Sequence, residues 1–172
     1  MRALLVAGAL TVGAALGMGS SSSRGGNFTL EQARAFEEFP LVWAGESAAG
    51  LPLTAILRRD DSARYVSFVY GDCTASSDSG CAPPVEVQVW PATERGFGSY
   101  GGSPADAAAP TPEPTRARGV AAAFVGESQL ELYGRRATVV VFSGSRERSL
   151  EVAKRLRCLR PNGRPRDGPL DC

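Results

Sequence analysis

The strongest constraint on the fold is a series of strand patterns in the last third of the chain. Residues 120–125 and 129–133 have the length and apolar content of strands. The almost continuously apolar run 137–142 (ATVVVF) is typical of a central strand covered on both faces. Gly134 and Arg135 suit the two-residue hairpin turn that would join the last two strands, because a left-handed first position favours glycine.

Four further strand patterns precede this region. They are residues 41–44, 53–58, 65–70 (YVSFVY) and 85–90 (VEVQVW), and the last of them alternates apolar and polar residues along its length. A polar turn at residues 60–62 separates the second pattern from the third.

A helix is predicted on each side of the strands. Ser145 or Ser149 can cap a C-terminal helix that runs to about Leu159. Near the N-terminus, Thr29 begins a shorter helix, and Gln32 is spaced to complete a capping box with it. Strands followed by a helix, with little strand–helix alternation, predict an α+β fold. We expect a mainly antiparallel sheet of about five to seven strands, with the N-terminal and the C-terminal helix packed on it.

Composition divides the chain into unequal parts. Residues 1–19 begin with Met1-Arg2, and the uncharged run that follows would be about 24 Å long as a helix, shorter than the ~30 Å apolar layer of a membrane. We therefore expect a signal peptide or signal anchor there, with a flexible linker at 20–26. Residues 27–172 are predicted to form a single disulfide-stabilised domain. It carries a disordered insertion, rich in Gly, Ala and Pro, at about 93–118.

The absence of histidine excludes several classes of function. The chain has 172 residues and no His, so Ser-His-Asp and Cys-His catalytic sites cannot be built from it. It has 19 basic and 18 acidic residues, a net charge of +1. No overall field attracts such a chain to nucleic acid, and no nucleic-acid partner is predicted.

The cysteines are even in number, as expected for disulfides in an oxidising compartment. Cys73, Cys81, Cys158 and Cys172 allow three pairings. We favour Cys73–Cys81 and Cys158–Cys172, because each pair encloses a turn-rich segment. A zinc site is the alternative, but the spacings are neither C-x2-C nor C-x4-C and no histidine can complete a mixed ligand set. No metal or cofactor is therefore predicted.

Two groups of polar residues deserve separate consideration as catalytic sites. Residues 45–50 (GESAAG) resemble a nucleophile elbow but have one residue too many before the second glycine, so a turn between strands is the better interpretation. Carboxylates could form an acid–base pair without histidine, although the sequence does not show any two converging. The available carboxylates are Glu37, Glu38, Glu46, Asp60, Asp61, Asp72 and Asp78. No catalytic residue is assigned.

The C-terminal helix and tail are rich in basic residues. They could face phosphates, anionic lipid or a polyanionic wall polymer. The alternative, which we prefer from the sequence, is a solvated helix face whose cations suit the C-terminal end of the helix dipole. The residues are Arg146, Arg148, Lys154, Arg155, Arg157, Arg160, Arg164 and Arg166.

Several segments resemble a group of bacterial proteins. They are FPLVWAGESAAGLPLT (39–54), YVSFVYGDC (65–73), GCAPPVEVQVW (80–90), LELYGRRATVVVF (130–142) and SLEVAKRLR (149–157). These segments are similar to uncharacterised exported proteins of GC-rich actinobacterial-type bacteria, over roughly residues 39–91 and 119–159. The resemblance implies a secreted or extracytoplasmic location and no particular activity.

Together these patterns lead to a ranked expectation for function. The first is a non-enzymatic, extracytoplasmic binding or structural domain, attached to the membrane if its N-terminal segment is not cleaved, or part of the cell envelope. The second is a histidine-free hydrolase that uses carboxylates, for example on glycans. The third is a protein that binds an anionic surface through its arginine-rich C-terminus. The ligand itself is not predicted.

Overall fold

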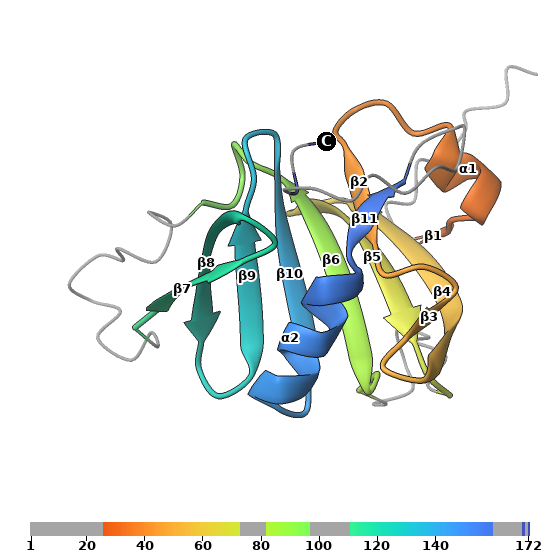
Figure 1. Cartoon of the computed structure of the whole chain (residues 1–172). Coiled ribbons are helices and arrows are strands. Elements are labelled where there is room, and N and C mark those ends of the chain that lie inside the picture. The colour runs from red at the N-terminus through yellow and green to blue at the C-terminus, as the bar shows by residue number, and fades with distance from the viewer. Residues whose placement is uncertain (1–25, 73–81, 97–110, 160–169, 171) are drawn as a thin grey trace, which may run out of the picture.

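The computed structural model describes residues 26–72, 82–96, 111–159, 170 and 172 (Figure 1). Cys73, Cys81, Asp78 and residues 1–25, on which several expectations depend, lie outside this part. Within it there are two helices and eleven strands. In chain order these are β1 (Gly26–Asn27), α1 (Leu30–Arg34), β2 (Leu41–Trp43), β3 (Ser47–Ala48), β4 (Leu51–Asp60), β5 (Arg64–Tyr70), β6 (Val85–Pro91), β7 (Glu113–Ala117), β8 (Val120–Val125), β9 (Gln129–Tyr133), β10 (Ala137–Ser143), α2 (Arg146–Arg155) and β11 (Arg157–Leu159).

Antiparallel pairing joins almost all of the strands into one sheet. Eight of them lie in the order β1-β4-β5-β6-β10-β9-β8-β7, and β3 also pairs with β4. Two up-and-down series, β4-β5-β6 and β7-β8-β9-β10, therefore meet where β6 pairs with β10. The predicted α+β class with a mainly antiparallel sheet is confirmed, while the expected count of about five to seven strands is too low.

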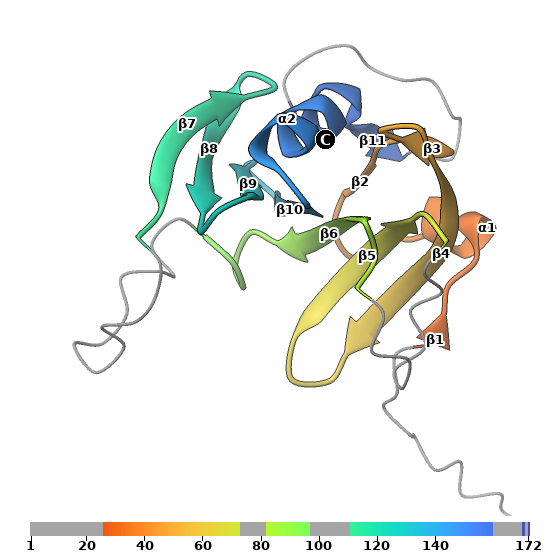
Figure 2. The ribbon, with the colours of Figure 1, turned by 90° about the horizontal axis from the view of Figure 1, so that it is seen from below.

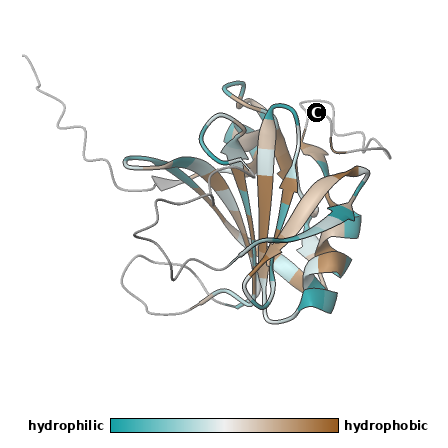
Figure 3. Ribbon diagram, turned by 90° about the vertical axis from the view of Figure 1, so that its left-hand side faces the viewer, coloured by the Kyte–Doolittle hydropathy of each residue, from teal (hydrophilic) through white to brown (hydrophobic). Residues whose placement is uncertain are grey.

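The main sheet is strongly curved, and its inner side holds the core. Figure 2 shows it curling around α2 and around a second, two-stranded sheet made of β2 and β11. Val152 and Ala153 of α2 pack in the same buried cluster as Val87 of β6 and Leu132 of β9. Apolar residues run as stripes along the central strands (Figure 3). The C-terminal helix thus packs on the sheet as predicted.

The central strands follow the predicted burial patterns. In β6 alternate valines, Val85, Val87 and Val89, are fully buried. In β10 every residue from Ala137 to Val141 is buried, so this strand is covered on both faces. Burial of this kind explains why the pattern ATVVVF lacks the alternation of β6.

The C-terminal helix is shorter than predicted. Ser145 is the N-cap, and its side chain accepts a hydrogen bond from the backbone N–H of Arg148 at 3.2 Å. The helix ends at Arg155, because Leu156 has extended backbone angles (φ −59°, ψ 133°). The expected continuation to Leu159 is wrong, because β11 forms there instead and pairs with β2. Without this pairing the backbone groups of β2 would lack hydrogen-bond partners.

The N-terminal helix has the predicted cap but not the predicted position. The backbone N–H of Thr29 donates to Gln32 Oε1 at 2.7 Å, and the backbone N–H of Gln32 donates to Thr29 Oγ1 at 3.1 Å. α1 has only five residues and buries Ala33 alone. It lies beside the β1–β4 edge rather than across the sheet, since one turn offers too little apolar area to cover a sheet face (Figures 1 and 2).

Two predicted irregular segments are partly ordered. Residues 113–117, expected to belong to a disordered insertion, form β7 and pair with β8. The turn between them has positive φ at Arg118 (50°) and Gly119 (74°), a geometry that matches the twist of a hairpin. Because β7 is an exposed edge strand, it tolerates both Pro114 and a low apolar content. Neither of these two sequence features therefore excludes a strand. Gly26, expected in the linker, belongs to β1.

The β9–β10 turn is shifted by one residue from the prediction. Gly134 donates its backbone N–H to the carbonyl oxygen of Ala137, which leaves Arg135 and Arg136 as the two turn residues. Gly134 is needed for another reason. A Cβ atom there would lie 2.8 Å from the Ala137 carbonyl oxygen and 3.1 Å from that of Leu170.

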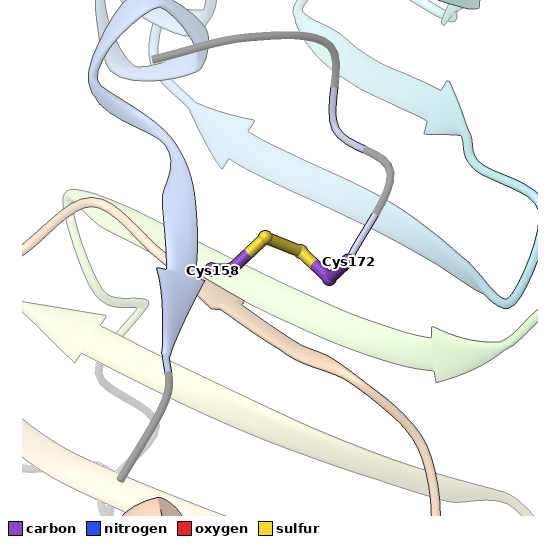
Figure 4. Close-up of a disulfide and its surroundings, with 2 residues drawn as sticks. All are labelled: Cys158 and Cys172. Atoms are coloured by element: carbon purple, nitrogen blue, oxygen red, sulfur yellow. A yellow bond between two sulfur atoms is a disulfide. The ribbon is translucent and has the colours of Figure 1, made fainter. Parts of the chain in front are cut away.

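One predicted disulfide is present. Cys158 of β11 and Cys172 are joined, with Cα atoms 5.8 Å apart and a sequence separation of 14 (Figure 4). The Cys158–Cys172 pairing is confirmed, while Cys73 and Cys81 lie outside the described residues. A disulfide of this kind fits an extracellular protein. Neither described helix is long and apolar enough to span a membrane.

Candidate anion-binding pocket

A pocket of about 390 Å³ opens where the end of α2 meets β11, the segment after β2 and the β7–β8 turn. Four of its lining residues are cations and one is a carboxylate. The described residues of the lining are Ala44, Glu46, Ser47, Arg118, Lys154, Arg155, Leu156 and Arg157. We call this site the basic pocket.

Arg157 is held in place by contacts on two sides. It is the first residue of β11 and lies opposite Trp43 of β2, and its guanidinium carbon is 5.3 Å from the centre of the Trp43 ring. Gly45 approaches it closely, since a Cβ atom on Gly45 would come within 3.1 Å of the Arg157 Cζ. A planar cation stacked in this way has already lost much of its freedom, so less entropy is lost when it binds a ligand.

Tyr70 fixes the segment that contacts Arg157. Its hydroxyl accepts a hydrogen bond from the backbone N–H of Ala44 at 3.1 Å and donates to the carbonyl oxygen of Gly45 at 3.2 Å. Burial raises the pKa of the Tyr70 phenol well above its usual value, although the Ala44 N–H and the charge of Arg157 act in the opposite direction. The phenol therefore remains protonated and able to donate.

Arg118 reaches the pocket from the β7–β8 turn. Its Nε is buried and has no hydrogen-bond partner among the residues that the structure describes. A buried donor without an acceptor is destabilising by about 1–3 kcal/mol. Arg118 also adds a second guanidinium to the lining of the pocket.

Lys154 and Arg155 come from the last turn of α2. Arg155 lies 4.0 Å from Glu151, whereas Lys154 makes no ion pair within the described part of the chain. Cations in a final helical turn suit the helix dipole. That effect does not account for Arg118 and Arg157, which come from other elements.

Glu46 is the carboxylate of the pocket, and Ser47 is its hydroxyl. Both belong to the GESAAG segment, whose last two residues, Ala49 and Gly50, form the β3–β4 turn with positive φ. The other described candidate carboxylates lie elsewhere: Glu38 and Asp60 pair with Arg58, for example. Among the described residues of the lining Glu46 is the one carboxylate, whereas the predicted alternative, a hydrolase acting on glycans, uses a pair. In the described ranges no three His, Cys, Asp or Glu residues are grouped so as to hold a metal ion.

The arginine-rich C-terminus is only partly assembled into this site. Lys154, Arg155 and Arg157 line the pocket, but Arg146 pairs with Glu113 at 2.6 Å on another part of the surface. Arg148 is exposed in the first turn of α2, and Arg160, Arg164 and Arg166 lie outside the described residues. Arg118 was missed because it was assigned to the insertion. The sequence signal that could have located Arg118 was the Arg118-Gly119 pair, which suits a hairpin turn between two short β patterns.

The outer face of the sheet is occupied by a connected set of side chains. Trp90 is half-buried and stacks on Tyr65, with the two ring centres 4.4 Å apart. Arg95 lies over its ring at 4.9 Å and also forms an ion pair with the buried carboxylate of Glu131. These contacts make Trp90 part of the folded structure rather than an open aromatic platform.

No protein-family model matches the chain, and neither the curated proteins nor the solved structures include a significant match to it.

Proposed function

We propose that the chain is an extracytoplasmic, non-enzymatic binding domain that holds an anionic ligand in the basic pocket. The observation that carries this proposal is the excess of positive charge: four cations and one carboxylate line the site. A neutral or cationic ligand would leave that charge unbalanced. An anionic ligand would neutralise it.

The extracytoplasmic location is supported by two independent features. The first is the Cys158–Cys172 disulfide, which persists in oxidising compartments. The second is the N-terminal sequence, in which Met1-Arg2 precedes an uncharged run up to residue 18. Both features are typical of proteins that operate outside the cytosol.

The energetics favour arginine as the main contact. A hydrogen bond between a charged donor and an oxyanion contributes about 1.5–3 kcal/mol. Arg157 is already stacked on Trp43, and Arg118 adds a second guanidinium to the lining. The negative end of the α2 dipole opposes an anion, but it amounts to only about half a charge against four full cations.

The proposal is tested by calorimetric titration of the oxidised chain with inorganic phosphate, pyrophosphate and citrate at low ionic strength. We expect saturable binding that weakens as salt is added. Arg157→Gln and Arg118→Gln should each weaken it by about tenfold or more, the loss of one charged hydrogen bond. Arg64→Gln is the matched control, because Arg64 pairs with Glu94 and does not line the pocket.

Two results would contradict the proposal. One is the absence of saturable binding for all three anions. The other is an affinity that Arg157→Gln and Arg118→Gln leave unchanged while both variants remain folded by circular dichroism.

A further inference from the structure

We infer that the ligand of the basic pocket is a phosphate monoester of a small polyhydroxy molecule. This inference rests on the proposed anion-binding function and specifies its ligand. It depends on the charge of the pocket, its volume and the position of Glu46 in its lining.

The charge of the pocket favours a dianion over a monoanion. Four cations against one carboxylate leave an excess of positive charge. A phosphate monoester carries about −1.5 to −2 at neutral pH and has three terminal oxygens, whereas a carboxylate or a phosphodiester carries −1. The planar fork of a guanidinium matches two phosphate oxygens at once, and both Arg118 and Arg157 line the pocket.

The volume shows that a phosphate group alone does not fill the site. About 390 Å³ corresponds to roughly 13 water molecules at the ~30 Å³ each occupies in the liquid. A phosphate group has five non-hydrogen atoms. The site therefore has room for a ligand with a body of several more atoms beyond its phosphate.

The polarity of the lining defines that body. Among the described residues of the lining only Ala44 and Leu156 are apolar, and both are themselves buried. An apolar body would gain little by entering such a site. A hydroxylated body can instead form hydrogen bonds with Glu46 and Ser47.

Glu46 is the residue that distinguishes a simple anion from a phosphate monoester that carries hydroxyl groups. Its carboxylate repels a simple anion, because it adds a negative charge to the site. A ligand with hydroxyl groups beside its phosphate converts the same carboxylate into a strong hydrogen-bond acceptor. A polyhydroxy phosphate monoester meets both requirements, since its phosphate binds the arginines and its hydroxyl groups bind Glu46.

The test compares ligands that differ by one feature each, titrated into the full-length oxidised chain. Glycerol 3-phosphate and glucose 6-phosphate are the expected ligands. Ethyl phosphate and inorganic phosphate lack the hydroxylated body, glucose lacks the phosphate, and glycerophosphoglycerol is a diester. We expect the first two to bind about tenfold or more tightly than all the others, the equivalent of one charged hydrogen bond.

Glu46→Ala distinguishes hydrogen bonding by Glu46 from a general charge effect. Removing its charge should raise the affinity for ethyl phosphate a few-fold and, by removing the acceptor, abolish the preference for glycerol 3-phosphate. Glu37→Ala removes an exposed carboxylate that does not line the pocket and should leave the preference unchanged. A change in total charge alone would shift all the anions in the same direction.

The outcomes separate the two proposals. If no anion binds, the proposed function and this inference both fail. If anions bind but ethyl phosphate, the diester or phosphoethanolamine binds as tightly as glycerol 3-phosphate, only the ligand class is wrong. A preference for glycerol 3-phosphate that survives in Glu46→Ala would also overturn the role of Glu46.

Discussion

The backbone N–H of Leu170 donates to the carbonyl oxygen of Arg118 at 3.4 Å. This contact joins the C-terminal tail to the turn that carries one arginine of the basic pocket. Two residues later, Cys172 is bonded to Cys158, which directly follows the second pocket arginine, Arg157. The tail therefore links two sides of the pocket that belong to different elements.

Cys172→Ser should destabilise the protein and weaken anion binding together. A disulfide that closes a loop of this length contributes about 3 kcal/mol, chiefly by restricting the unfolded chain. Urea unfolding measures the loss, and phosphate titration measures the effect on the pocket. Cys158→Ser is the matched variant and should behave alike. Unchanged unfolding midpoints in both variants would contradict the structural role of this bond.

Gly134→Ala should be destabilising although the residue lies next to an exposed turn. Its new Cβ would approach the carbonyl oxygens of Ala137 and Leu170 at 2.8 and 3.1 Å, so the tail or the strand must move. Overpacking of this kind costs about 1–3 kcal/mol. Gly144→Ala is the control, because its Cβ would meet nothing within 4 Å. Thermal unfolding of the two variants should differ clearly, and equal midpoints would be evidence against this packing.

Tyr70→Phe should lower both stability and anion affinity. The substitution leaves the backbone N–H of Ala44 and the carbonyl of Gly45 without their buried partner. The expected cost is about 1–3 kcal/mol in the free energy of unfolding. Because Gly45 contacts Arg157, binding of phosphate should weaken as well. Tyr65→Phe is a suitable comparison, since no hydrogen bond of the Tyr65 hydroxyl is known within the described residues. A loss in Tyr65→Phe equal to that in Tyr70→Phe would contradict the assignment.

Stability should fall in alkaline solution because of the same phenol. Burial raises the pKa of Tyr70 in the folded state, whereas the unfolded phenol ionises near pH 10. Between these two values the folded state binds more protons, so its stabilisation is complete below about pH 10 and is lost as the pH rises toward the folded pKa. Urea unfolding from pH 9 to 12 should show that the free energy of unfolding declines more steeply in the native chain than in Tyr70→Phe. Parallel curves for the two proteins would contradict this.

Arg95→Leu tests the buried ion pair on the outer face of the sheet. Glu131 is fully buried and also accepts hydrogen bonds from Gln129 at 2.6 Å and Tyr133 at 3.1 Å. Removing the arginine leaves a buried charge without its main counter-ion. We expect the free energy of unfolding to fall by about 3 kcal/mol. This value lies at the lower end of the range for buried ion pairs, because the Arg95 side chain is 21% exposed. The double variant Arg95→Leu/Glu131→Leu should recover part of it. A double variant less stable than Arg95→Leu would contradict this account.

Local patterns were sufficient for the elements that bury many apolar residues. The runs at 65–70, 85–90 and 137–142 became β5, β6 and β10 with ends shifted by a residue at most. Their β-branched and aromatic residues both favour extended backbone and fill the core. The capping box at Thr29 and the cap at Ser145 were equally local. In each case the residues that determine the structure are adjacent in the chain.

The sequence by itself determined the antiparallel α+β class, the absence of histidine chemistry and the Cys158–Cys172 pairing. The tertiary structure decided the rest. β7 and β11 are strands because β8 and β2 offer them backbone partners, and Arg118 meets Arg157 because the curved sheet brings the β7–β8 turn to the end of α2. Hydrogen-bond partners and charges that come together from distant segments leave no periodic signal in either segment, so only the folded chain reveals the pocket they form.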